Sequence, residues 1–140
     1  MRRKEYYCIA ISHSPQEVVS AFAHHLGFHA MYGTEVKLDP SRSFFVGVDY
    51  KDIHKIVTRK DTILNNIIRD NNLSHSQSIG VGDTEHDIDF LAIVSQPICF
   101  NPNKKLYNHA MKHGWKIIVE RKDVIYELKS GKLQNIKKRR

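Results

Sequence analysis

The sequence predicts an α/β fold in which a mainly parallel sheet is covered by helices on both faces. Short apolar runs of strand length alternate along the chain with segments whose apolar residues recur at helical spacing. Strands that are separated by helices pair in parallel, because each helix returns the chain to the end of the sheet at which the previous strand began. The 140 residues, 41% hydrophobic and 26% charged, are enough for one domain with a buried core.

The first strand and the first helix are separated by a Pro-containing turn. Residues 6–11 form a short apolar and aromatic run, which predicts a buried strand. In the helix that follows, Ser14 suits the N-cap, Pro15 suits the first position and Glu17 completes a capping box. Gly27 supplies the stop signal.

A small β-hairpin is predicted near residues 35–48. Two strand-like runs, 35–38 and 44–48, flank the turn-rich segment 39–43. A helix then begins near Lys60, because apolar residues again recur at helical spacing, and it ends at Asn71-Asn72.

The remaining elements continue the alternation. Strands are predicted at 78–81, 97–100 and 115–119, and helices at 85–94, 104–113 and 123–129. Residues 1–131 are predicted to form the domain, and 132–140 a mobile basic tail.

The net charge of +7 lies at the two ends of the chain. Residues 2–4 and 137–140 are all Lys or Arg and account for the whole excess. A basic surface can bind nucleic acid, but charged ends are usually solvated, and the sequence contains no zinc-finger, RNA-recognition or helix-turn-helix pattern. A basic nucleic-acid-associated domain is therefore only a second alternative.

Membrane insertion is not expected, because no apolar run approaches the roughly 20 residues of a spanning helix. Cys8 and Cys99 lie in separate strand-like runs, a placement typical of reduced thiols. These features predict a cytoplasmic protein with no membrane partner.

Two carboxylates, Asp83 and Asp87, stand where the apolar run 78–81 becomes a helix. In parallel sheets, ligands bind at the edge formed by the carboxyl ends of the strands, and carboxylate oxygens suit Mg²⁺. The alternative is that Asp83 is only a helix N-cap and Asp87 only a first-turn acid. The stretch by itself leaves both interpretations open.

Ser12 and Lys60 are two further candidates. Ser12 follows the first strand, where a hydroxyl and the N–H groups of a turn can bind a phosphoryl oxygen, or where it is simply a turn residue. Lys60 begins a predicted helix and faces the positive end of its dipole, which a nearby anion would explain. The alternative is a solvated lysine in a basic stretch.

The order of these residues resembles the second, third and fourth motifs of the haloacid dehalogenase-like phosphatases, in particular the phosphoserine phosphatase-like branch. Ile9-Ala10-Ile11-Ser12 is similar to the second motif, Lys60 to the third, and Gly82-Asp83-Thr84-Glu85-His86-Asp87 to the fourth. Further similarity lies at Leu26-Gly27, Tyr32-Gly33-Thr34-Glu35, Asn101-Pro102 and Leu106 to Trp115. The resemblance spans about residues 6–128 and implies a Rossmann-like fold.

The resemblance implies a Mg²⁺-dependent phosphatase that attacks a phosphorylated small molecule with an aspartate. The Ser12 hydroxyl and the His13 N–H would bind phosphoryl oxygens, and Lys60 would neutralise the phosphoryl charge. Asp83 would bind the magnesium ion directly. Asp87 would hold a metal-bound water or Lys60.

The chain departs from that family at its first motif, Asp-x-Asp-x-Thr, which supplies the nucleophile upstream of the second motif. Here only 11 residues precede Ser12, and Glu5 is the only acid among them. Asp49 and Asp52 follow the hairpin and are not expected to attack in line. The helical cap is missing as well, so the chain is predicted to be the C-terminal part of such a phosphatase.

The lost strand would lie between those ending at Ser12 and Asp83, which leaves a gap at the centre of the sheet. Because buried backbone groups need partners, we expect the chain to close the gap, to bind an upstream fragment or to self-associate. Activity is expected only when the missing segment completes the site. The alternative is a non-catalytic remnant that binds phosphate or serves as an interaction module.

Overall fold

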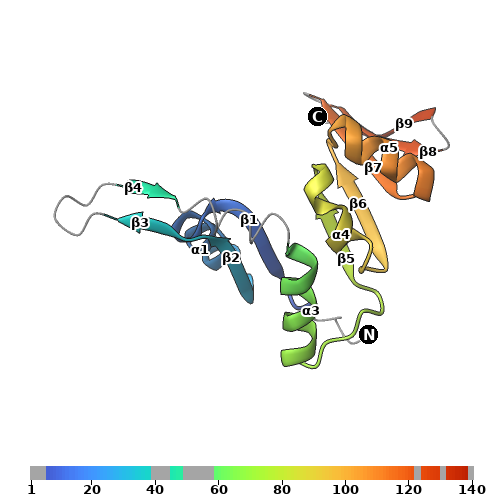
Figure 1. The fold of residues 1–140 in the computed structure, drawn as a ribbon. Coiled ribbons are helices and arrows are strands. Elements are labelled where there is room, and N and C mark those ends of the chain that lie inside the picture. Colours follow the sequence, from blue (N-terminus) through green and yellow to red (C-terminus); the bar gives the residue numbers. More distant parts are fainter. Residues whose placement is uncertain (1–5, 39–44, 49–58, 122–123, 130–131, 139–140) are drawn as a thin grey trace. The chain divides into compact units, whose positions relative to one another are not determined.

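The computed structural model describes residues 6–38, 45–48, 59–121, 124–129 and 132–138. The chain divides into two compact units, Met1–Arg59 and Lys60–Arg140. Figure 1 labels the helices and strands of both units. Among the described residues, the first unit has two two-stranded sheets and one helix, and the second unit has a five-stranded sheet and three α-helices.

The first unit is built on a parallel strand pair with one helix. Strand β1 (Ile9–Pro15) pairs with β2 (Ala30–Thr34), and α1 (Gln16–His25) connects them and packs against them (Figure 1). The helix buries Val19 and Ala23. This is the strand-helix-strand unit that the alternation predicts, although β2 itself was not predicted.

The start of α1 differs from the prediction. Pro15 is the N-cap and no side chain caps the helix, while Ser14 lies inside β1. The predicted capping box at Ser14 is therefore wrong, because the extended backbone of β1 continues to the helix. The stop is confirmed, since Gly27 follows α1 with a φ of 73°.

The hairpin prediction is confirmed. Strands β3 (Val36–Leu38) and β4 (Phe45–Val48) pair in antiparallel register, with Lys37 opposite Gly47. The turn predicted at 39–43 lies outside the described residues.

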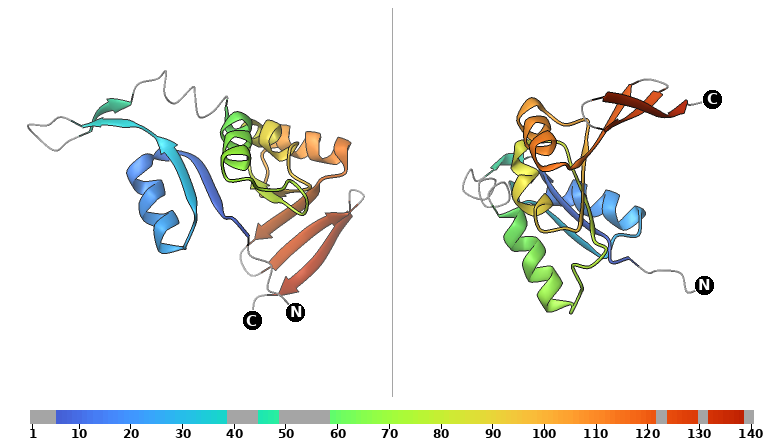
Figure 2. Two further views of the ribbon diagram at one scale, coloured as in Figure 1. Left: turned by 90° about the horizontal axis from the view of Figure 1, so that it is seen from below. Right: turned by 90° about the vertical axis from the view of Figure 1, so that its right-hand side faces the viewer.

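The second unit contains a five-stranded sheet in the order β5-β6-β7-β8-β9. Strands β5, β6 and β7 are parallel, and β8 and β9 extend the sheet in antiparallel pairing at its far end (Figure 2). The strands are β5 (Ile79–Gly82), β6 (Gln96–Phe100), β7 (Lys116–Arg121), β8 (Val124–Lys129) and β9 (Lys132–Lys138). Within the described residues β5 is an edge strand and pairs only with β6.

The helices of this unit are α3 (Lys60–Asp70), α4 (Ile88–Leu91) and α5 (Lys104–His113), and a 3-10 turn, η1 (Glu85–Asp87), leads into α4. They position a core of five fully buried residues from α4, β6, α5 and β7: Leu91, Cys99, Leu106, Ala110 and Ile117. The core joins α4 and α5 to strands β6 and β7, and the turn that follows β5 leads into α4.

Two C-terminal predictions are wrong. The helix predicted at 123–129 is strand β8, because Val124, Ile125 and Tyr126 are residue types that favour strands and β7 offers a pairing edge. The tail predicted at 132–140 forms strand β9 over residues 132–138. The α/β class and the parallel pairing are confirmed. No helix of the described part of the chain is long and apolar enough to cross a bilayer.

Candidate functional site

The site begins with a buried ion pair between the first residue of α3 and the last residue of η1. Lys60 Nζ lies 2.6 Å from Asp87 Oδ1. The two residues are only 8% and 3% exposed. Lys60 is therefore not a solvated lysine. Asp87 supplies the nearby anion that was expected to compensate a lysine at the positive end of the helix dipole.

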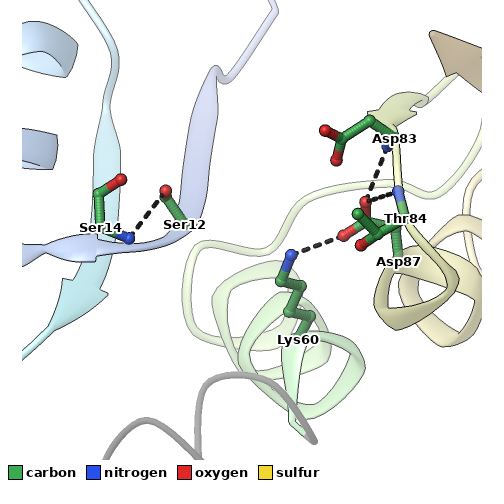
Figure 3. Close-up of polar contacts among 6 residues, drawn as sticks. All are labelled: Ser12, Ser14, Lys60, Asp83, Thr84 and Asp87. Carbon is green, nitrogen blue, oxygen red and sulfur yellow. Dashed lines mark hydrogen bonds and ion pairs between the residues drawn. The ribbon is translucent and has the colours of Figure 1, made fainter. Parts of the chain in front are cut away.

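The second oxygen of Asp87 binds the turn after β5. Asp87 Oδ2 accepts hydrogen bonds from the backbone N–H groups of Asp83, at 2.9 Å, and of Thr84, at 3.1 Å. Figure 3 shows Asp87 between Lys60 and this turn. One carboxylate thus joins the start of α3 to the end of β5.

Asp87 stays ionised because its partners outweigh its burial. Burial raises the pKa of Asp87, but the hydrogen bonds from Lys60, Thr84 and Asp83 together hold that pKa below its ordinary value. Gly82 makes room for this arrangement, since a Cβ there would lie 2.6 Å from Asp87 Cβ. The glycine before Asp83 is therefore required by a close approach of side chain to backbone.

Asp83 has the opposite surroundings. Its side chain is exposed and makes no hydrogen bond or ion pair with the described residues, and its carboxylate is directed away from Asp87 (Figure 3). The alternative interpretation, in which Asp83 is only a helix N-cap, is wrong, because Thr84 occupies that position at the start of η1. The free carboxylate near the sheet edge is Asp83, and the engaged one is Asp87.

This division bears on the magnesium prediction. A magnesium ion commonly takes one or two protein carboxylates and keeps several waters. Asp83 fits such a ligand, whereas both oxygens of Asp87 are occupied by protein groups. Among the described residues no three His, Cys, Asp or Glu side chains form a group that could hold a metal ion.

The turn after β5 has further partners that the motif did not indicate. Asn103 N–H donates to the Asp83 carbonyl at 2.8 Å, and the Asn103 side-chain amide donates to Glu85. This amide, a backbone hydrogen bond at Glu85 and the contact with Lys105 together lower the pKa of Glu85 to about 2. Asn103 was missed because its partners precede it by some 20 residues, and the only local signal was its fitness as the N-cap of α5.

Ser12 and His13 belong to the first unit. Ser12 Oγ accepts the N–H of Ser14 at 3.2 Å (Figure 3). A hydroxyl oxygen that accepts a hydrogen bond keeps its own hydrogen to donate. The His13 carbonyl accepts from Thr34 Oγ1 at 2.9 Å, so β2 holds this segment in place. The structure brings Lys60, Asp83 and Asp87 together, and the addition of Ser12 and His13 stays a prediction.

Several solved structures have a similar fold. A haloacid dehalogenase-family hydrolase from Salmonella enterica serovar Typhi matches with a TM-score of 0.62 at 12% identity, over 72% of this chain and 34% of that one. A substrate-bound phosphoserine phosphatase matches with a TM-score of 0.59 at 16% identity, over 72% and 47%. A phospho-aspartyl intermediate analogue of phosphoserine phosphatase matches with a TM-score of 0.58 at 18% identity, over 81% and 51%.

The chain thus spans about half the length, or less, of these structures. No curated protein matches its sequence significantly. The family model described as haloacid dehalogenase-like hydrolase matches residues 1–92, which is more than half of the chain. The chain therefore belongs to the haloacid dehalogenase-like hydrolase family.

Proposed function

We propose that this chain carries part of the active site of a Mg²⁺-dependent phosphomonoester hydrolase and does not turn over substrate by itself. The observation that supports this most directly is the buried Lys60–Asp87 pair, 2.6 Å apart, next to the free carboxylate of Asp83. In this proposal Lys60 would supply a fixed cation and Asp83 a metal ligand at the end of a parallel strand, where α/β folds bind ligands.

Each residue has a distinct role in this proposal. The Lys60 ammonium has three N–H donors, and Asp87 takes one of them, so the others can bind a phosphoryl oxygen. Asp87 would act through Lys60 by holding the ammonium group in place. Asp83 would bind magnesium, which when bound supplies charge stabilisation to the transferring phosphoryl group.

Ser12 and His13 would complete the phosphate site. The Ser12 hydroxyl would donate to a phosphoryl oxygen, since its own oxygen already accepts the Ser14 N–H. The His13 N–H would support the same oxygen. The substrate is then a phosphorylated small molecule.

The nucleophile would come from a segment that is not among these residues. Asp49 and Asp52 lie outside the described part of the chain. Strand β5 pairs only with β6 within that part, and its Ile79 and Val81 are 49% and 59% exposed. An unpaired strand edge with exposed apolar side chains is a template for another strand, which supports completion by an upstream fragment or by self-association.

The test is hydrolysis of p-nitrophenyl phosphate with and without Mg²⁺. We expect no turnover by the chain alone and Mg²⁺-dependent turnover when a polypeptide with an Asp-x-Asp-x-Thr strand is added. A polypeptide whose first Asp is replaced by Asn is the control for the nucleophile, and Asp83→Asn, at an exposed side chain, is the control for this chain. Turnover by the chain alone, or an unchanged rate with Asp83→Asn, would contradict the proposal.

A non-catalytic phosphate-binding remnant is the alternative, and the lack of a nucleophile motif in the sequence favours it. It predicts that phosphate or a phosphate mimic binds the chain and that no added polypeptide produces turnover. Titration with vanadate or inorganic phosphate, followed by amide chemical shifts of Ser12 and of the turn 83–84, distinguishes the two.

A further inference from the structure

All four polar groups of Asn103 make hydrogen bonds, either to the turn that follows β5 or to the first turn of α5. Its N–H donates to the Asp83 carbonyl at 2.8 Å, and its carbonyl accepts the N–H of Tyr107 at 2.8 Å. Its side-chain oxygen accepts the N–H of Leu106 at 3.0 Å, and its side-chain amide donates to Glu85. The turn after β5 is therefore tied to the start of α5 through one residue.

The Asp83 peptide is held from both sides as a result. Asp87 binds its N–H, and Asn103 binds its carbonyl, while the Asp83 side chain stays free of the described residues. A carboxylate side chain whose own peptide is hydrogen-bonded on both sides loses little conformational freedom when it binds a cation. We propose that Asn103 is a positioning residue that fixes the Asp83 backbone for ligand binding.

The residue type at this position follows from the two tasks of the side chain. An N-cap must accept a hydrogen bond, and here it accepts from Leu106. The contact with the Glu85 carboxylate requires a donor, because an ionised carboxylate only accepts. Asn supplies both an acceptor and a donor. Ionised Asp can cap α5 but has no donor for Glu85, and Ser can cap α5 but its hydroxyl donor stands on a shorter side chain than the Asn amide.

Lys105 adds a second contact to the same carboxylate, at 3.1 Å, but its side chain is exposed. An exposed ion pair of this type contributes little. The side-chain link between α5 and the turn after β5 thus depends on the hydrogen bond between Asn103 and Glu85. The role for Asp83 rests on the proposed function, whereas the fixing of its backbone can be measured without any ligand.

The test uses a hydrogen-bond swap between Asn103 and Glu85. Asn103→Asp keeps a good N-cap but places a carboxylate against Glu85. Adding Glu85→Gln restores a donor and an acceptor with their direction reversed. Asn103→Ser keeps a capping oxygen without the added charge, and Asn108→Asp puts the same charge at an exposed position of α5.

Amide hydrogen exchange of the full chain is the first measurement. We expect Asn103→Asp to accelerate exchange at Asp83 and Thr84 by about five- to tenfold, the loss of one hydrogen bond. Asn103→Ser should also accelerate exchange at these two amides, and Asn108→Asp should leave their exchange rates unchanged. The double variant Asn103→Asp with Glu85→Gln should restore the wild-type rates. Unchanged exchange, an equal rise throughout the second unit, or no restoration by the swap would each overturn the proposal.

Mg²⁺ affinity, measured by calorimetry, is the second measurement. Outer-shell substitutions of this type weaken metal binding by about tenfold or more, and we expect that loss for Asn103→Asp with recovery in the swap. A wild-type chain that binds no Mg²⁺ would contradict the metal role of Asp83 in the proposed function. The exchange result would still support or overturn the fixing of the Asp83 backbone by Asn103.

Discussion

Lys60 Nζ and Asp87 Oδ1 are 2.6 Å apart although the residues are 27 positions apart in the sequence, and both side chains are buried. The pair brings the first residue of a helix against the turn that follows β5. A lysine at a helix N-terminus opposes the helix dipole, so its partner must supply both charge and hydrogen bonding. Asp87 does so while it also binds two backbone N–H groups of the turn.

Removal of Lys60 should strongly destabilise the second unit. Lys60→Met leaves Asp87 buried without its cation, and we expect a loss of about 3–5 kcal/mol in the free energy of unfolding. Lys104 is the matched control, because it also begins a helix but is exposed. Lys104→Met should change that free energy by less than about 0.5 kcal/mol.

The measurement is urea unfolding followed by the fluorescence of Trp115, the single tryptophan, which lies in the second unit. Equal effects of the two substitutions would show that burial of the Lys60–Asp87 pair does not matter for stability. A large loss for Lys60→Met alone would support the pair.

The pair should make stability depend on pH in the acid range. Because the folded-state pKa of Asp87 is lowered, its contribution is complete above the ordinary carboxyl value of about 3.9 and is lost as the pH falls through the folded value. Asp87→Asn should be less stable at pH 7 and should lose less stability between pH 5 and pH 2. Parallel urea titrations at these values give the difference, and identical slopes for both proteins would contradict the expectation.

Gly82→Ala should displace Asp87. The added Cβ would lie 2.6 Å from Asp87 Cβ and 2.8 Å from Oδ2, and overpacking of this type costs about 1–3 kcal/mol. Gly80→Ala in the same strand also crowds its neighbours, with Val94 Cγ2 at 2.9 Å and atoms of Leu91 and Phe90 at 3.2 Å, but it does not approach Asp87. We expect faster amide exchange at Thr84 only for Gly82→Ala.

Gly33→Ala should disturb the first unit. A Cβ at Gly33 would lie 2.6 Å from the Cα of Gln16 and 2.9 Å from the carbonyl oxygen of Ser14, and backbone atoms cannot move aside as side chains do. Gly27→Ala meets open space and carries only the cost of its positive φ, about 1 kcal/mol. Amide exchange across α1 and β2 should rise much more for Gly33→Ala, and the reverse order would contradict this account.

Local signals predicted several elements well. Helix α3 runs from Lys60 to Asp70, close to the predicted start and stop, because its apolar spacing and the Asn pair are local features. The hairpin of β3 and β4 follows from a turn-rich segment between two apolar runs. In these elements the tertiary contacts agree with the local signals.

Other elements depended on partners far along the chain. Strand β2 has a short sequence, Ala30–Thr34, and its pairing with β1 was not visible locally. Residues 124–129 carry acceptable helical spacing but become β8, because β7 offers an open edge with matching register. Strand β9, at 132–138, was missed since its basic sequence resembles a solvated end.

For the site, the sequence alone determined which residues are candidates, since a hydroxyl, a lysine and two carboxylates stand in the order of the family motifs. The tertiary structure decided how the two carboxylates divide their roles. Asp87 is engaged by Lys60 and the turn, and Asp83 is left free. The physical reason is that a buried charge takes whichever partner the packing of α3 against the turn provides, and spacing along the chain does not specify that partner.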